Sequence, residues 1–321
     1  MMTLSYILTR LKGRYSVRYF PRFKQVPYPS DFLAETEKAN NMIYDLLSSG
    51  KPAMISRLGA FEFYTTICYM QKRHPLWMLR KIYPFWVTPD VNQAMINNTG
   101  FFNSSNKAYC QFADLMTECI KLVDILGEWS TNENVVEKYM NCKKVHLDAL
   151  VPFFANKPWT QYLENKKVLV IHPFKNTILS QYQNRHKLFD NKSILPDFSQ
   201  LTVYKSVQSL GGGQDATKYK SWFDALEHMQ KDIDCIDYDV ALIGCGAYGM
   251  PLAAHCKSRG KQAIHLGGAV QLLFGIKGKR WETEDYYLDK YPPIMNNPYW
   301  VYPNETERPQ NFSNVENGCY W

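Results

Sequence analysis

The chain of 321 residues contains no uninterrupted apolar run of the roughly 18 residues that a membrane-spanning helix needs. It also lacks a secretory signal, because the apolar run after Met1 is broken at Arg10 and no small-residue cleavage site follows. We therefore expect a cytoplasmic protein that is either soluble or bound peripherally to the inner face of the cell membrane.

Paired cysteines are missing as well. The chain has 8 cysteines, but none forms a CxxC motif or a Cys/His cluster at zinc-ligand spacing. Several of them lie in apolar patterns, as buried free thiols do in a reducing compartment. The sequence thus predicts neither a disulfide framework nor a structural zinc site.

Acidic residues are absent from positions 1–30, which form a basic N-terminal arm with Tyr and Phe between the cations. Two interpretations remain open: residues 1–25 contact an anionic membrane surface, or the arm is solvated. No RNA- or DNA-binding motif accompanies the charge, so we do not expect nucleic acid as a partner. The basic residues are Arg10, Lys12, Arg14, Arg18, Arg22 and Lys24.

Beyond the arm, predicted strands alternate with predicted helices. This alternation is typical of an α/β, Rossmann-like fold with a mainly parallel sheet flanked by helices. We predict one α/β catalytic domain over 31–285 and an irregular C-terminal tail over 286–321. Strands are expected at 52–56, 167–171, 201–206, 240–243 and 262–266. Helices are expected at 31–49, 62–70, 108–126, 177–188 and 220–232 and up to residue 259, with an irregular stretch at 74–106.

A glycine-rich turn follows the 240–243 strand. Its sequence, Gly-Cys-Gly-Ala-Tyr-Gly, opens a helix that has Pro251 in its first turn, where a missing N–H costs little. Glycines allow close backbone approach, and a helix N-terminus offers N–H groups and partial positive charge to a phosphate. The motif predicts a phosphate loop, and the alternative is a tight turn without a ligand. The candidate binding residues are Gly244, Gly246, Ala247, Tyr248 and Gly249.

The next strand argues against a dinucleotide cofactor. A dinucleotide fold places an acidic residue at the end of this strand to hold a ribose hydroxyl. Here that position is His265, followed by Gly267. A mononucleotide, a nucleotide-sugar or S-adenosylmethionine therefore remain as ligand classes.

A basic block comes shortly afterwards. Lys277, Lys279 and Arg280 can neutralise a diphosphate, and Trp281 can stack on a base or a sugar. The alternative is a solvated basic loop.

Two further strand ends carry side chains that can bind a ligand or transfer a proton. Open α/β sheets place their ligand crevice at the carboxyl ends of strands. Arg57, Gly59 and Glu62 follow the 52–56 strand, and His172 follows the 167–171 strand. Arg57 can hold an anion, whereas Glu62 can act as a general base or bind a metal.

Together these motifs resemble the GT-D class of bacterial glycosyltransferases, first catalogued as a domain of unknown function. Arg57, Gly59 and Glu62 match the Arg-x-Gly-Asp-x-Glu element of that family, and Asp239 to Gly268 follows its late glycine block. The sequences His-Leu-Gly-Gly and Phe-Gly-Ile-Lys-Gly-Lys-Arg-Trp look like a subgroup found among polysaccharide-assembly proteins. The resemblance extends over about 50–285.

The resemblance implies a glycosyltransferase that moves a sugar from a nucleoside diphosphate donor, a UDP-sugar, to a surface polysaccharide or other glycan, including a lipid-linked one. Glu62 and His265, which lie in the two matching elements, are candidate catalytic residues, and His172 is a third because of its place at a strand end. The resemblance also implies Mn²⁺ or Mg²⁺ at Glu62, but Ala60 and His265 replace two carboxylates of the family. Cations of the basic block are the alternative to a metal. Other open classes are an S-adenosylmethionine-dependent or other Rossmann-type enzyme, and a non-catalytic nucleotide- or glycan-binding protein.

Overall fold

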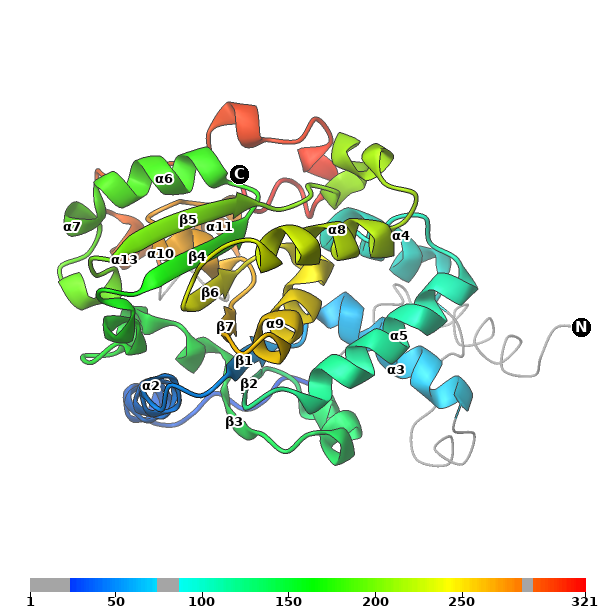
Figure 1. The fold of residues 1–321 in the computed structure, drawn as a ribbon, viewed down its shortest axis with the longest axis horizontal. Helices are drawn as coiled ribbons and strands as arrows, with labels where there is room; N and C mark the ends of the chain where they lie inside the picture. The colour runs from blue at the N-terminus through cyan, green and yellow to red at the C-terminus, as the bar shows by residue number, and fades with distance from the viewer. Residues whose placement is uncertain (1–23, 74–86, 285–290) are drawn as a thin grey trace, which may run out of the picture.

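A seven-stranded sheet forms the centre of the protein (Figure 1). The computed structural model describes residues 24–73, 87–284 and 291–321. Neighbouring strands pair in parallel in the order β3-β2-β1-β7-β6-β4-β5. The predicted parallel α/β architecture is therefore confirmed. The strands are β1 (Ala53–Arg57), β2 (Ile125–Glu128), β3 (Lys143–His146), β4 (Lys167–His172), β5 (Gln200–Lys205), β6 (Val240–Ile243) and β7 (Gln262–His265).

The central strands are apolar on both faces because both faces are covered by helices. In β4, Leu169 and Ile171 point into one hydrophobic cluster, and Val168 and Val170 point into the other. All four side chains are at most 1% exposed. This pattern explains why β4 reads as a continuous hydrophobic run.

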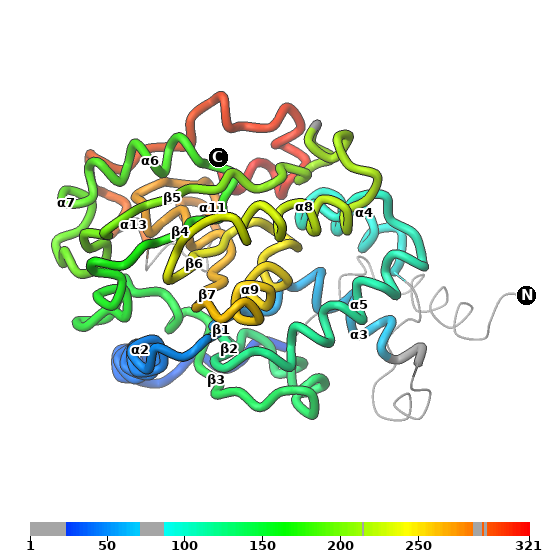
Figure 2. The backbone as a smooth tube through the Cα atoms, in the orientation of Figure 1, coloured from blue at the N-terminus to red at the C-terminus, as the bar shows by residue number. Residues whose placement is uncertain are grey.

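Helices of the first cluster cover one face of the sheet, and Figure 2 shows α8 and α9 to the right of the labelled strands. The first face carries α3 (Ala60–Arg73), α4 (Pro89–Thr99), α5 (Asn106–Lys121), α8 (Trp222–Asp234) and α9 (Gly249–Ser258). The second face carries α2 (Phe32–Ser48), α6 (Lys175–Gln183), α7 (Arg185–Leu188), α10 (Ala269–Leu273), α11 (Lys279–Thr283) and α13 (Pro292–Met295).

Helix α4 corrects the expectation of irregular structure over 74–106. Thr88 caps its N-terminus through the Val91 N–H, Pro89 occupies the first turn, and Gly100 ends it with a left-handed φ of 77°. These are ordinary start and stop residues, which the Pro- and Asn-rich composition obscured. Residues 74–86 of the same prediction lie outside the described residues.

Two short strands were not expected. The helix predicted over 108–126 ends at Lys121, and β2 begins at Ile125, opposite Ile55 of β1. A brief apolar run fits a helix and a strand equally well, so pairing in the sheet decides its structure. Strand β3 is four residues long and begins with two lysines, which gives it no strand pattern.

The C-terminal segment 291–321 packs against the second face. It contains only short helical turns, yet Trp300, Val315 and Trp321 are buried in the cluster there. At the other end, Lys24 and Val26 hydrogen-bond to Thr131 and Trp129 just after β2. Residues 1–23 of the basic arm lie outside the described residues.

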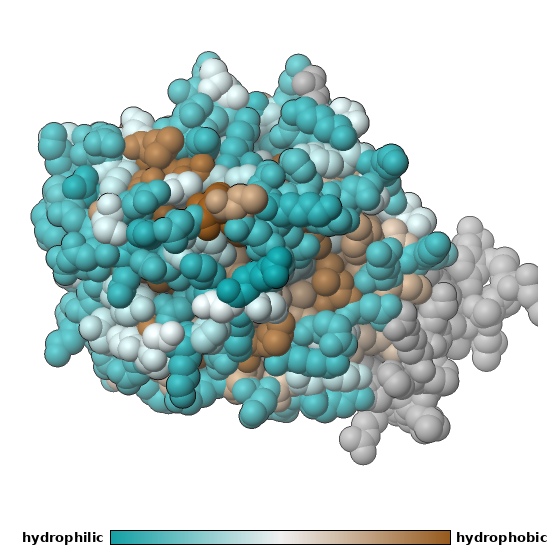
Figure 3. Space-filling model, in the orientation of Figure 1, coloured by the Kyte–Doolittle hydropathy of each residue, from teal (hydrophilic) through white to brown (hydrophobic). Residues whose placement is uncertain are grey.

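The molecular surface is mainly polar on the face drawn in Figure 3, where apolar side chains show only in small patches. None of the helices in the described ranges is both long and apolar enough to span a membrane.

Candidate functional site

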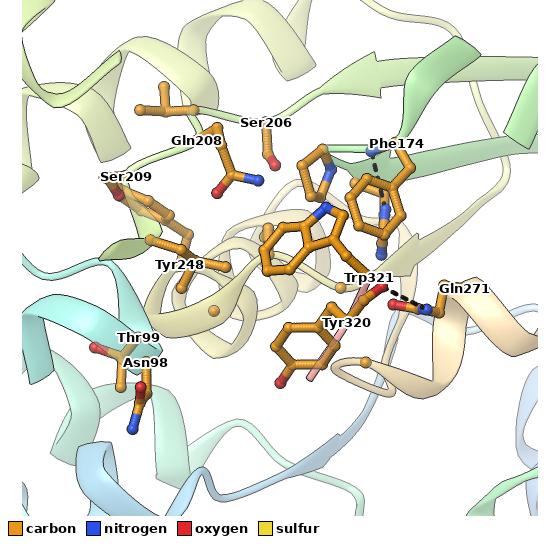
Figure 4. A pocket seen from close by; sticks show the side chains of 18 residues that line it. Asn98, Thr99, Phe174, Ser206, Gln208, Ser209, Tyr248, Gln271, Tyr320 and Trp321 are labelled. Atoms are coloured by element: carbon orange, nitrogen blue, oxygen red, sulfur yellow. Dashed lines mark hydrogen bonds between the residues drawn. The ribbon is translucent and has the colours of Figure 1, made fainter. Parts of the chain in front are cut away.

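A pocket lies where the chain topology changes direction. The chain leaves β4 toward β5 but leaves β6 toward β7, so the two neighbouring strands β4 and β6 send their connections to opposite sides. Parallel sheets bind ligands at the carboxyl ends of strands at such a switch point. Here the loops after β4, β5 and β6 and the C-terminal segment enclose about 520 Å³, open mouth included (Figure 4).

His172 lines this pocket at the end of β4. Its ring is 3% exposed, and its Nδ1 accepts a hydrogen bond of 3.1 Å from the Phe174 N–H. Burial lowers the pKa of His172 to about 3, so the ring is neutral near pH 7. Because Nδ1 is the acceptor, the proton resides on Nε2. His172 can therefore donate a hydrogen bond to a ligand rather than accept a proton from it.

The glycine loop also lines the pocket, through Gly244, Gly246 and Tyr248. Gly246 has a left-handed φ of 58°, and a Cβ there would meet the Thr99 carbonyl oxygen at 2.6 Å. Ala247 is buried. Tyr248 stacks on Trp222 with centroids 4.8 Å apart, and its hydroxyl lies 3.3 Å from the Ser209 hydroxyl. Close contacts with Thr99, Trp222 and Ser209 thus hold the loop that lines the pocket.

Two buried polar groups in the pocket lack partners. Gln208 is 9% exposed and Trp321 is 7% exposed. Gln208 Nε2 and Trp321 Nε1 each have no hydrogen-bond partner among the described residues. Sequence reasoning missed both residues. The expectation that ligands bind at the carboxyl ends of strands, which indicated His172, also applies to Gln208, three residues beyond β5. No local sequence pattern indicates Trp321.

Arg57 stands at the end of β1, farther along the same edge of the sheet. Its Nε is buried and has no hydrogen-bond partner among the described residues. Gly267 turns with a φ of 59° beside it, and a Cβ there would lie 3.2 Å from Arg57 Nη1. Gly268 of the same turn lines the pocket. The β7 turn therefore connects the pocket to the Arg57 guanidinium.

Glu62 lies next to Arg57, in the first turn of α3. Its carboxylate folds back against Gly59, where a Cβ would overlap it. Burial raises the pKa of Glu62, while its own backbone N–H and the Arg57 charge act in the opposite direction. The structure thus brings Arg57, Gly59 and Glu62 together, as their sequence spacing predicts.

A second glutamate near Arg57 was not expected. Glu133 is fully buried; its Oε1 accepts from the Trp129 N–H at 3.4 Å, and its Oε2 has no partner among the described residues. Burial raises the pKa of Glu133 to about 8, and the Arg57 charge opposes this shift. Glu133 is therefore mostly protonated near pH 7. It lies between polar residues in a 3-10 helix, where nothing in the sequence distinguishes it.

His265 occupies a different environment from His172. It is 6% exposed, its Nδ1 lies 3.0 Å from the Ser56 hydroxyl, and its ring presses against Gly249. Burial, together with the Arg57 charge, lowers its pKa to about 3. His265 joins β7 to β1 and to the start of α9, outside the pocket wall.

The basic block lies beside the pocket rather than in its lining. Arg280 is paired with Glu316 and with Glu284, the latter at 3.3 Å, and its guanidinium lies 4.9 Å from the Tyr320 ring centroid. Lys279 is exposed, Lys277 is half-buried and Trp281 is 4% exposed. The charge of Arg280 is thus used to hold the C-terminal segment.

The surroundings of Glu62 bear on whether it can hold a divalent metal. The Arg57 charge acts on its carboxylate and opposes a second cation there. In the described part of the chain no three His, Cys, Asp or Glu side chains gather as metal ligands do. The described side chains alone therefore do not assemble a metal site at Glu62.

The fold and this crevice define a parallel α/β protein of the Rossmann-like class. No protein-family model matches the chain, and no curated protein matches it. One solved structure it resembles is described as "The highly conserved domain of unknown function 1792 has a distinct glycosyltransferase fold". That likeness has a TM-score of 0.29 and 13% identity, covering 80% of this chain and 92% of that one. Another, the "Selenomethionine substituted structure of domain of unknown function 1792", gives 0.28 and 11% over the same shares. Similarities this weak do not assign a function.

Proposed function

We propose that this protein is a glycosyltransferase that binds a nucleoside diphosphate sugar, a UDP-sugar, along the carboxyl edge of the sheet. The acceptor we propose is a hydroxyl of a surface polysaccharide or other glycan. One observation carries this proposal: the Nε of the Arg57 guanidinium is buried without a hydrogen-bond partner among the described residues, beside the glycine turn that borders the pocket.

The arrangement of groups along the edge suits a nucleotide diphosphate. The pocket at β4 and β6 offers neutral N–H donors, and Arg57 at β1 offers a positive charge. A guanidinium binds phosphate oxygens through two parallel N–H bonds. The nucleoside then occupies the pocket and the diphosphate extends over the Gly267–Gly268 turn toward Arg57.

In the proposed reaction an acceptor hydroxyl oxygen forms a bond to the anomeric carbon of the sugar. The bond from that carbon to the diphosphate oxygen breaks, and the electron pair leaves with the diphosphate. Arg57 stabilises the negative charge that develops there. Glu62 takes the hydroxyl proton, and its raised pKa makes it a stronger base than an exposed carboxylate.

The two buried histidines have different parts in this scheme. His172 orients the nucleotide by donating from Nε2. His265 takes no step, since its ring is held between Ser56 and Gly249.

Titration calorimetry with UDP, UDP-sugars and S-adenosylhomocysteine tests the proposal. We expect UDP to bind with a dissociation constant of about 1 μM to 1 mM, the usual range for substrates. Arg57→Lys should weaken that binding by about tenfold or more, because a point charge replaces the two-pronged donor. Arg259→Lys is the matched control, since Arg259 pairs with Asp234 at the opposite edge of the sheet. If S-adenosylhomocysteine binds and none of the nucleoside diphosphates binds, the proposal is wrong.

A further inference from the structure

We infer that the Tyr320 hydroxyl donates a hydrogen bond to the diphosphate of the donor and that, with Arg57, it stabilises the charge on this leaving group. The inference rests on the proposed function and adds to it a residue of the C-terminal segment. It concerns how the leaving group is held, whichever base and sugar the donor carries.

Tyr320 stands in the wall of the pocket with its phenol accessible to a ligand. It is one of the lining residues, and its side chain is only half-buried. Figure 4 shows the ring extending away from the Trp321 indole, with the hydroxyl at its far end. A molecule in the pocket can therefore reach the hydroxyl.

The Gly267–Gly268 turn brings this phenol close to Arg57. A Cβ at Gly267 would lie 3.2 Å from Arg57 Nη1, and a Cβ at Gly268 would lie 2.7 Å from Tyr320 Cε1, the atom next to the carbon that bears the hydroxyl. The Arg57 charge also acts to lower the pKa of Tyr320. A diphosphate that crosses the turn therefore passes both the guanidinium and the phenol.

Arg280 fixes the orientation of the phenol and leaves its proton free. Its Nη1 donates to the Tyr320 hydroxyl oxygen at 3.1 Å, and its guanidinium is itself held by Glu284 and Glu316. A guanidinium has only donors, so the hydroxyl proton is not used in this contact. No acceptor for that proton occurs among the described residues. A ligand can therefore supply the acceptor.

The phenol is protonated near pH 7 and polarised by the arginine. Burial raises the pKa of Tyr320, and the charges of Arg280 and Arg57 act in the opposite direction without cancelling that effect. A hydroxyl oxygen that accepts one hydrogen bond becomes a stronger donor of another. A phosphate oxygen suits such a donor, because hydrogen bonds to an ionised oxygen are shorter and stronger than those between neutral groups.

In the proposed reaction Tyr320 donates a hydrogen bond and transfers no proton. When the bond from the anomeric carbon to the diphosphate oxygen breaks, the electron pair stays with the diphosphate. The hydrogen bond from Tyr320 strengthens as this negative charge grows, as in other sites that stabilise a developing oxyanion. Arg57 thus contributes the positive charge, and Tyr320 contributes a neutral, directional donor.

Calorimetry and phosphorus NMR of the full chain, with UDP as the probe, test the inference. Tyr320→Phe keeps the ring and removes only the hydroxyl, so UDP should bind about tenfold more weakly, as expected for a lost hydrogen bond to a charged oxygen. At saturating UDP, at least one phosphate resonance should shift relative to the complex with the unchanged protein. Tyr302→Phe is the matched control and should change neither quantity, since the Tyr302 hydroxyl donates to Glu282 of α11 at 2.7 Å, outside the pocket.

The outcomes separate this inference from the proposed function. If Arg57→Lys weakens UDP binding but Tyr320→Phe changes neither the affinity nor the phosphate resonances, the inference alone is wrong. It is also wrong if Tyr320→Phe weakens binding while the phosphate resonances stay in place, because the hydroxyl then supports only the pocket wall. Thermal unfolding without ligand should show a midpoint lowered by no more than about 4 °C in Tyr320→Phe. If no nucleoside diphosphate binds to the unchanged protein, the proposed function fails and the inference fails with it.

Discussion

The carboxylate of Glu62 lies directly against the α carbon of Gly59, three residues earlier at the start of α3. Any side chain at position 59 would displace it. The spacing of the Arg57–Glu62 motif thus has a steric reason: the glycine makes room for the carboxylate next to the Arg57 guanidinium.

Glu62→Gln should separate catalysis from binding. The amide fits the same space but cannot take a proton, so we expect turnover to fall by about 100-fold or more. The dissociation constant for UDP should change by less than about threefold. Steady-state kinetics and calorimetry measure the two quantities, and Glu227→Gln on the surface of α8 is the control. Unchanged turnover would remove Glu62 from the role of base.

Gly246→Ala should destabilise the fold more than its backbone strain alone explains. Gly246 and Gly260 both have positive φ, 58° and 80°, but only at Gly246 would a Cβ meet a backbone oxygen, that of Thr99. We expect Gly260→Ala to cost about 1 kcal/mol of unfolding free energy and Gly246→Ala about 2–4 kcal/mol. Urea unfolding measures both. Equal losses would show that the Thr99 contact is easily relieved.

Glu133→Gln should alter how stability depends on pH. The native pKa of Glu133 is about 8, against an ordinary value of 4.5, so between these values the native state holds a proton that the unfolded chain has lost. Stability from this group is present below about pH 4.5 and is lost as pH rises toward 8. The glutamine variant has no such loss, so its stability relative to the unchanged protein should increase from pH 5 to pH 8.

Thermal unfolding across that pH range checks the Glu133 prediction. Glu137→Gln is the control, because Glu137 lies in the same 3-10 helix and pairs with Lys144 with an exposed side chain. Parallel pH curves for Glu133→Gln and the unchanged protein would contradict a raised pKa at this position.

Glu307→Gln should loosen the C-terminal segment. The Glu307 carboxylate accepts from two N–H groups of α6 and from the Thr177 hydroxyl at 2.5 Å. An amide keeps one acceptor oxygen, so we expect a loss of about 1–3 kcal/mol in unfolding free energy. UDP binding should weaken too, because the segment carries Trp321. Glu305→Gln, an exposed neighbour, should change neither quantity; full UDP affinity in Glu307→Gln would show that the segment needs no such anchor.

The sequence predicts most of the sheet because its strands are buried on both faces. Five of the strands appear where β-branched runs end in turns, within a residue or two of their observed bounds. Strands β2 and β3 could not be foreseen, since four residues with little alternation acquire their structure from pairing with β1. Thr88, Pro89 and Gly100 did mark α4 in the sequence, although its composition suggested irregular structure.

The site is predictable only where it follows strand ends. That rule indicates Arg57, Glu62, His172 and the glycine loop, all of which lie along one edge of the sheet. It does not indicate Trp321, which reaches the pocket through packing of a segment without regular structure. Nor does it indicate that Arg280 is engaged by Glu316, because ion pairing between distant loops leaves no periodic pattern.

The pairing of β1 with β7 has a consequence for how the chain folds. Ser56 and His265 touch although 209 positions separate them in sequence, and the β1–β2–β3 half of the sheet meets the other half only through β7. Such high contact order slows folding, because the entropy of closing a long loop is lost before the contact forms. During synthesis β1 leaves an open, apolar strand edge until β7 has emerged. The growing chain can therefore aggregate through that unpaired edge. A chaperone that covers β1 should increase the yield of native protein.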